Sequence, residues 1–104
     1  MTNVNVYLTL PVIRSFRSRA LRRYWLYGDS SRIKPEWQVR TRLILSQLDV
    51  AQRPNEMNLL GLRFHALTGD QRGRFAVLVS RNWRVTFAFE GEDAVEIDME
   101  DYHG

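Results

Sequence analysis

The chain has 104 residues and only two histidines, His65 and His103, which are the side chains best suited to acid–base chemistry. An imidazole with an ordinary pKa of about 6.5 takes up or releases a proton near neutral pH. Two such groups suit RNA cleavage without a metal: one removes the proton of a ribose 2′-hydroxyl and the other protonates the leaving oxygen. The alternative is that His65 is an ordinary structural residue and His103 an unremarkable residue near the chain end.

Three arginines and one tyrosine are candidates for binding RNA. Arg84 lies in the middle of a predicted strand, where its charge would stabilise a phosphate during reaction. Arg72 and Arg74 flank the end of a glycine-bounded loop, residues 69–73, whose backbone amides and two guanidiniums suit a phosphate. Tyr102 is a candidate for stacking on a base. The alternatives are a surface ion pair for Arg84, a plain hairpin loop, and packing of Tyr102 against the sheet edge.

Several classes of site are excluded by composition and spacing. There are no cysteines, which excludes disulfides and thiolate metal sites. The two histidines and scattered carboxylates match no metal-ligand spacing, so we expect neither a metal nor another cofactor. No apolar run approaches the ~20 residues that span a bilayer, and the first twelve residues lack the pattern of a secretory signal. The sequence therefore predicts a cytoplasmic protein that does not enter a membrane.

Charge is distributed unevenly along the chain. Residues 1–53 carry ten cations against three acids, whereas residues 91–104 carry six acids and no cation. Fourteen of the fifteen cations are arginine, whose planar fork matches phosphate oxygens. This pattern favours a polyanionic partner. The alternative is that a GC-rich genome simply favours arginine codons.

The candidate residues are positioned by a predicted antiparallel sheet. In residues 74–103, apolar Trp83, Val85, Phe87 and Phe89 alternate with other residues, as expected for strands with one face on a core. Turn-like breaks at residues 80–82 and 91–93 divide this stretch into three strands of a meander. A fourth strand is predicted over residues 62–67. His65 thus lies where the chain enters the sheet and His103 where it leaves.

Helices are predicted to cover this sheet. Apolar residues at helical spacing predict one helix from Arg14 to Tyr27, with Ser15 as its N-cap. A second helix is predicted from Pro35 to Asp49, with an apolar face formed by Trp37, Leu43 or Ile44, Leu45 and Leu48. Residues 1–11 are a candidate edge strand and residues 50–60 a loop. The predicted fold class is α+β, with two N-terminal helices packed on a small antiparallel sheet in a single domain, residues 1–104.

Four segments, in this order, resemble the HigB branch of the RelE/ParE toxin superfamily: Ile13–Phe16 (IRSF), Leu62–Asp70 (LRFHALTGD), Asn82–Phe87 (NWRVTF) and the closing Asp101–His103 (DYH). The resemblance covers residues 12–103. It implies a RelE-like microbial RNase fold and a toxin of a type II toxin–antitoxin system that cuts mRNA in the A site of the 30S ribosomal subunit. The implied partners are a helix-turn-helix HigA-like antitoxin and, through their complex, operator DNA.

The resemblance also implies roles for individual residues. By match to the family motifs, His65, Asp101, Tyr102 and His103 correspond to active-site positions, and Arg84 to a phosphate-binding arginine. The implied reaction is attack of the ribose 2′-oxygen on phosphorus, which leaves a 2′,3′-cyclic phosphate. His103 or Asp101 is then the proton acceptor and His65 the donor, or the reverse.

Two departures from the family pattern bear on these expectations. Thr68 stands where the family often has lysine, which predicts either weaker activity or substitution by Arg72 or Arg74. Family members tend to begin near Val12, so we interpret residues 1–11 as an N-terminal extension from an upstream start.

Two other functional classes stay open at this point. One is a non-catalytic inhibitor on the same fold, either a gyrase-blocking relative or a decayed toxin. The other is a regulatory protein that binds operator DNA through a basic helix surface, residues 17–23 and 40–42.

Overall fold

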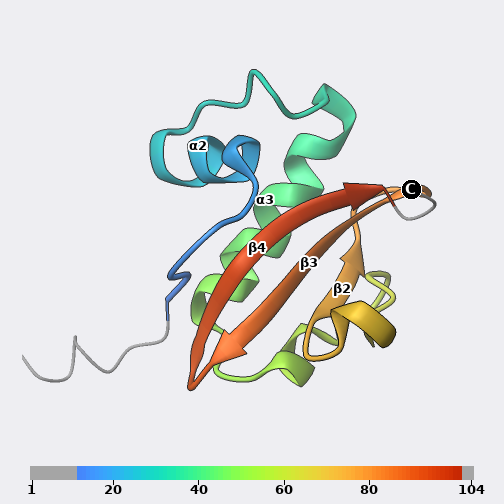
Figure 1. Ribbon diagram of the computed structural model, residues 1–104. Coiled ribbons are helices and arrows are strands. Elements are labelled where there is room, and N and C mark those ends of the chain that lie inside the picture. Colours follow the sequence, from blue (N-terminus) through green and yellow to red (C-terminus); the bar gives the residue numbers. More distant parts are fainter. Residues whose placement is uncertain (1–11, 102–104) are drawn as a thin grey trace, which may run out of the picture.

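The computed structural model describes residues 12–101, in which two α-helices and two short 3-10 helices accompany a four-stranded sheet (Figure 1). The predicted edge strand over residues 1–11 lies outside the described residues. In chain order the elements are α2 (Arg19–Tyr27), α3 (Pro35–Val50), η1 (Pro54–Met57), β1 (His65–Ala66), η2 (Gly69–Gln71), β2 (Phe75–Leu78), β3 (Trp83–Glu90) and β4 (Asp93–Asp101).

The sheet has the order β1-β2-β3-β4 with every neighbouring pair antiparallel, which confirms the predicted meander. The strand predicted over residues 62–67 is wrong in extent, because only His65 and Ala66 pair with β2. Gly61 and Arg63 have positive φ angles of 86° and 53°, which turn the backbone out of the extended conformation. The side chain of Leu62 is buried in the core instead.

The prediction of a helix from Arg14 is wrong by five residues. Residues 12–17 run parallel to β4, with bridges that join Ile13 to Ala94 and Phe16 to Ile97. Because their backbone groups bond to β4, these residues cannot also begin a helix. The helix begins at Arg19, and its N-cap is Ser18, whose hydroxyl accepts a hydrogen bond from the backbone N–H of Leu21 at 3.1 Å. The predicted N-cap, Ser15, instead accepts a hydrogen bond from the backbone N–H of Glu96.

Helix α3 is confirmed, and it begins at a proline as predicted. Four of its side chains are buried against the sheet: Thr41, Ile44, Leu45 and Leu48. Ile44 rather than Leu43 belongs to the core, since Leu43 is half exposed. The predicted loop after α3 contains η1, which directs the fully buried Met57 into the same core.

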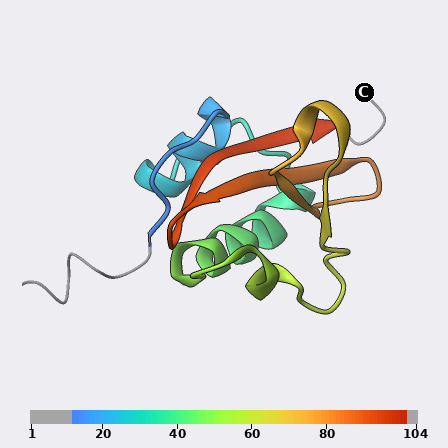
Figure 2. The same ribbon diagram turned by 60° about the horizontal axis from the view of Figure 1, so that its bottom comes forward.

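The helices and the sheet form two layers. Helix α3 crosses one face of the sheet and α2 packs beside it along β4 (Figures 1 and 2). Val77, Val85, Phe87 and Ile97 point into the core between the layers. The opposite face of the sheet, which we call the open face, is not covered by α2 or α3. No helix within residues 12–101 is long and apolar enough to cross a bilayer.

Candidate functional site

His65 lines a surface cleft of about 610 Å³ together with four other residues, Arg63, Phe64, Leu78 and Arg81. Nδ1 of His65 lies 3.0 Å from the carbonyl oxygen of Arg63. Since a carbonyl only accepts hydrogen bonds, this contact favours the tautomer with a proton on Nδ1, in which Nε2 is the basic nitrogen. A half-buried imidazole in a cleft that two arginines also line suits a reaction on a phosphodiester.

The backbone beside His65 has an unusual conformation. Arg63 has a φ angle of 53°, in the left-handed region that residues other than glycine seldom adopt. Such conformations concentrate at functional sites, where the surrounding structure holds them in place. Here the turn at Arg63 lets its carbonyl reach the ring of His65 and keeps its own side chain at the cleft.

The register of the sheet brings His65 and Arg84 to the open face. His65 pairs with Ala76, and Ala76 pairs with Thr86. In the next row on the same face, Arg84 pairs with Leu78. Directly opposed residues of antiparallel strands point to the same side. His65 on β1 and Arg84 on β3 are therefore separated by two strand spacings across the sheet and by two residues along it, or roughly 12 Å between backbones.

The guanidinium of Arg84 is held by Glu100, its partner across β3 and β4. Nη2 of Arg84 lies 3.2 Å from Oε1 of Glu100. Two further groups donate hydrogen bonds to this carboxylate: Nε2 of Gln71 at 3.2 Å and Oγ1 of Thr86 at 2.9 Å. Burial raises the pKa of Glu100, but the hydrogen bonds from Gln71, Thr86 and Arg84 outweigh burial and leave the pKa below its ordinary value. Glu100 is thus an anion that directs Arg84.

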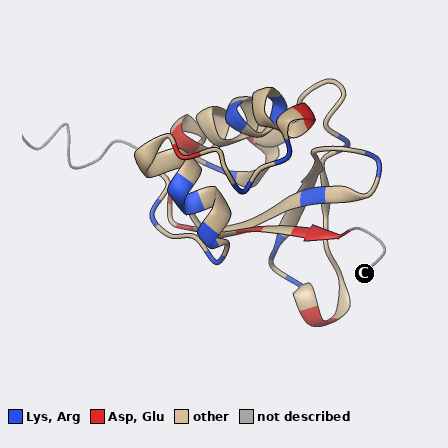
Figure 3. Ribbon diagram, turned by 90° about the horizontal axis from the view of Figure 1, so that it is seen from above, with Lys and Arg blue, Asp and Glu red and all other residues tan. Residues whose placement is uncertain are grey.

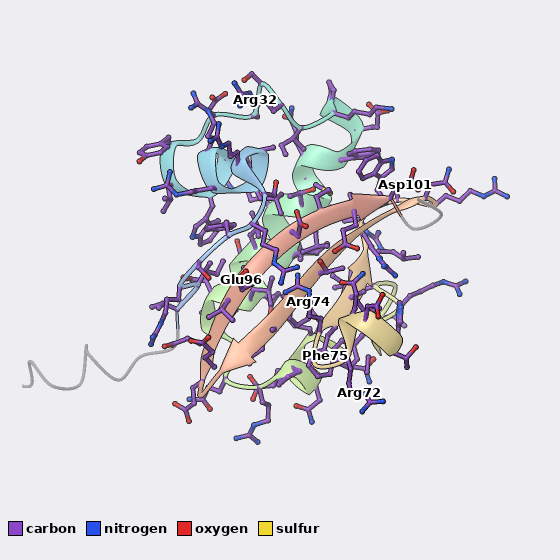
Figure 4. All side chains as sticks on the ribbon, viewed as in Figure 1. Arg32, Arg72, Arg74, Phe75, Glu96 and Asp101 are labelled. Carbon is purple, nitrogen blue, oxygen red and sulfur yellow. The ribbon has the colours of Figure 1, made fainter. Side chains whose placement is uncertain are left out.

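The structure does not bring Arg72 and Arg74 together. Arg74 is only 7% exposed, and its Nη2 donates to Oγ1 of Thr86 at 2.8 Å and to the carbonyl of Glu96 at 2.7 Å. Burial lowers the pKa of Arg74, and the charge of Arg17 acts in the same direction. Figure 4 shows Arg74 over the middle of the sheet, whereas Arg72 lies below η2. Arg72 is exposed, and a phosphate contact by either residue stays a prediction.

Asp101 ends β4, at the far end of the sheet from its turn with β3 (Figure 4). It pairs with Trp83, whose ring packs 5.4 Å from that of Trp37 on α3. This register gives Asp101 the helix-covered side, opposite to Arg84. Tyr102 and His103 lie outside the described residues. Within residues 12–101, no three His, Asp or Glu side chains converge as a metal-ligand set.

Sequence reasoning missed the groups that surround the predicted residues. Arg63 and Arg81 line the cleft of His65, and Glu100 with Gln71 holds Arg84. A signal for Glu100 existed in the sequence, because alternation along the last strand gives it the polar face. Its pairing with Arg84 requires the register, which depends on the turn between β3 and β4.

Comparison with known proteins gives two matches. A family described as "RelE-like toxin of type II toxin-antitoxin system HigB" matches residues 14–103. The chain is also 33% identical over 92 residues to a protein of Proteus vulgaris named Endoribonuclease HigB. That similarity covers 88% of this chain and 100% of the relative. The family match takes in the cleft of His65 and the pair formed by Arg84 and Glu100.

Proposed function

Since the chain belongs to the HigB-like family of RelE-like toxins of type II toxin–antitoxin systems, we propose that it is an endoribonuclease that cuts mRNA on the ribosome. The observation that carries this proposal is the position of His65, in a cleft with Arg63 and Arg81 and on the sheet face that bears Arg84. Membership in a type II system implies a cognate antitoxin. We propose that this antitoxin is a HigA-like protein, that the complex binds operator DNA, and that the toxin acts in the cytoplasm.

The proposed reaction is a transfer within the RNA strand. The ribose 2′-oxygen bonds to the adjacent phosphorus while the bond from phosphorus to the 5′-oxygen breaks. Protonated His65 gives its proton to that 5′-oxygen, and Arg84 stabilises the charge that develops on the phosphate. The products are a 2′,3′-cyclic phosphate and a free 5′-hydroxyl. One proton passes from the 2′-hydroxyl to the acceptor, and the other passes from His65 to the 5′-oxygen.

The proton acceptor in this proposal comes from the end of β4. His103 rather than Asp101 takes the proton of the 2′-hydroxyl in this proposal, because the register gives Asp101 the side of the sheet opposite to Arg84. Tyr102 stacks on a base beside the cut. Arg63 and Arg81 hold the flanking phosphates, a task for which the sequence suggested Arg72 and Arg74. Guanidiniums at a cleft wall offer the forked donors that phosphate oxygens accept.

The test uses purified ribosomes carrying a defined mRNA. We expect wild-type protein to cut the mRNA, and we expect His65→Ala to lower the rate roughly 10²- to 10⁴-fold, the range for removal of a general acid or base. Mapping the RNA ends should reveal a 2′,3′-cyclic phosphate. Naked mRNA, assayed in parallel, measures how far cleavage depends on the ribosome.

Arg53→Ala is the matched control, because the side chain of Arg53 is exposed and its ion pair with Glu56 is long, at 4.0 Å. This variant should cut mRNA at the wild-type rate. Cleavage by His65→Ala at the wild-type rate would contradict the mechanism. If mRNA stayed intact after incubation with wild-type protein and DNA gyrase were inhibited, the protein would be a non-catalytic inhibitor and not a nuclease.

A further inference from the structure

The strand that carries His65 stops short of the end of its neighbour. Pairing between β1 and β2 extends back along the chain only to His65. The backbone N–H of Leu78 still donates to the carbonyl of Leu62 at 2.8 Å, but the N–H of Leu62 donates to the carbonyl of Leu59 instead. In a regular antiparallel pair, the two residues exchange both of these bonds. The carbonyl of Leu78, at the end of β2, therefore does not receive the N–H that a longer β1 would offer.

Arg40 on α3 supplies a donor at this position. Its Nε donates to the carbonyl of Leu78 at 3.0 Å, and its Nη2 donates to the carbonyl of Gly61. One guanidinium thus joins α3 to the end of β2 and to the turn that leads into β1. The planar fork of arginine holds several donors in a fixed arrangement, whereas lysine has one ammonium on a flexible stem. Arg40 therefore closes the gap that the short β1 leaves.

The two basic residues of α3 differ in what they contact. Figure 3 shows basic residues on both helices and acidic residues along β4. Arg40 is half-buried and Arg42 is exposed, and within residues 12–101 neither forms an ion pair. In the described part of the chain, Arg40 but not Arg42 bonds to the backbone beside the cleft. Arg42 is therefore a matched control for Arg40, with the same charge on the same helix.

The turn that Arg40 holds determines the surroundings of His65. Gly61 and Arg63 both have left-handed φ angles, and between them the side chain of Leu62 is only 3% exposed. Because its first residue is bonded to Arg40 and its middle residue is packed in the core, the turn fixes the position of its third residue. The carbonyl of that residue, Arg63, lies 3.0 Å from Nδ1 of His65. A continuous series of contacts thus leads from α3 to the imidazole.

We propose that Arg40 is a positioning residue for His65. By holding the turn at residues 61–63, it keeps the carbonyl of Arg63 where that carbonyl accepts the Nδ1 proton, which leaves Nε2 as the nitrogen that gives a proton to RNA. This proposal rests on the proposed function, in which His65 is the proton donor. The described lining of the cleft does not include Arg40, so Arg40 acts through the backbone.

The experiment compares Arg40→Lys with Arg42→Lys, since both variants keep the charge and remove only the guanidinium fork. The first measurement is the tautomer of neutral His65, determined from the nitrogen chemical shifts of the ring at about pH 8.5, above the ordinary imidazole pKa. The His65→Ala variant identifies the signals. We expect Nδ1 to carry the proton in wild type and in Arg42→Lys. We expect Arg40→Lys to move this proton largely to Nε2.

The second measurement is cleavage of mRNA on ribosomes. Arg40→Lys should lower the single-turnover rate about tenfold, which is less than the loss expected on removal of the general acid itself. The KM should stay close to the wild-type value, because a misplaced ring weakens proton transfer and not the binding of RNA. Arg42→Lys should match wild type in both constants. Circular dichroism verifies that each variant is folded.

An unchanged tautomer in Arg40→Lys would overturn the proposal, as would an equal shift in Arg42→Lys. If Arg40→Lys does not fold, Gly61→Ala takes its place, because alanine is strained at the φ angle of 86° and disturbs the same turn while Arg40 is intact. Gly61→Ala should shift the tautomer in the same direction, and a wild-type tautomer there would overturn the proposal. Intact mRNA after incubation with wild-type protein refutes the proposed function separately, because the tautomer is measured without RNA.

Discussion

Glu100 determines both the direction and the net charge of the region around Arg84. Its carboxylate accepts hydrogen bonds from β3 and from η2, so a single side chain fixes the guanidinium relative to the loop that follows His65. Arginine is most useful to a developing phosphate charge when it is held in place before the reaction, since its reorientation then costs nothing. We therefore regard Glu100 as a positioning residue for Arg84.

Glu100→Gln should separate orientation from binding. The substitution keeps the size of the side chain but removes its charge, so we expect the rate constant for mRNA cleavage to fall about tenfold, near 1.4 kcal/mol, while the KM stays close to wild type. Single-turnover and steady-state cleavage on ribosomes measure the two constants. Added to Arg84→Ala, Glu100→Gln should cause little further loss, because both changes remove one interaction. Losses that simply multiply would show that Glu100 acts independently of Arg84.

At the scale of elements, local sequence patterns predicted the helices and strands whose bounds depend on residues close in the chain. Alternation in β3 and the proline at the start of α3 are local signals, and both elements appear where they were predicted. The start of α2 was missed because residues 12–17 pair with β4, a contact between chain ends that no local pattern records. The roles predicted for His65 and Arg84 followed from residue type and stay predictions, whereas the pairing of Glu100 with Arg84 required the strand register.

The N-cap of α2 offers a test of this reassigned boundary. We expect Ser18→Ala to lower the free energy of unfolding by about 1 kcal/mol, the usual effect of losing a capping hydroxyl. Ser46→Ala is the control, since Ser46 is exposed within α3, where alanine is favoured over serine. Urea denaturation measures both variants. A helix that began at Arg14 would leave Ser18 in its interior, and Ser18→Ala would then be neutral or stabilising.

At the scale of the whole molecule, carboxylates that accept several hydrogen bonds stabilise the fold of a predominantly basic chain. Hydrogen bonds from the side chain and backbone of Ser31, and then from Arg23, lower the pKa of Asp29 to about 2. The pKa of Glu100 is also below its ordinary value. Both carboxylates therefore bind protons more weakly in the folded chain than in the unfolded chain, and folding stability rises with pH where they titrate.

This linkage predicts how stability responds to acid. The contribution of the two carboxylates is fully present above about pH 5, where unfolded carboxyls with ordinary pKa values near 4 are ionised, and is lost as the pH falls toward the folded pKa values. Asp29→Asn/Glu100→Gln should be less stable than wild type at pH 7 but should lose less stability between pH 5 and pH 3. Urea midpoints across this range provide the measurement. Parallel curves for the two proteins would exclude these carboxylates as the source of acid sensitivity.

The parallel pairing of residues 13–16 with β4 also has a consequence in time. It joins positions as far apart as Ser15 and Glu96, which are separated by 81 residues. During synthesis, the amino-terminal segment has no partner until the last described strand has been made, and contacts between distant positions form late. The unfinished chain has neither a closed sheet edge nor the partner of Arg84. The arrangement around Arg84 is thus complete only after synthesis has passed Glu100.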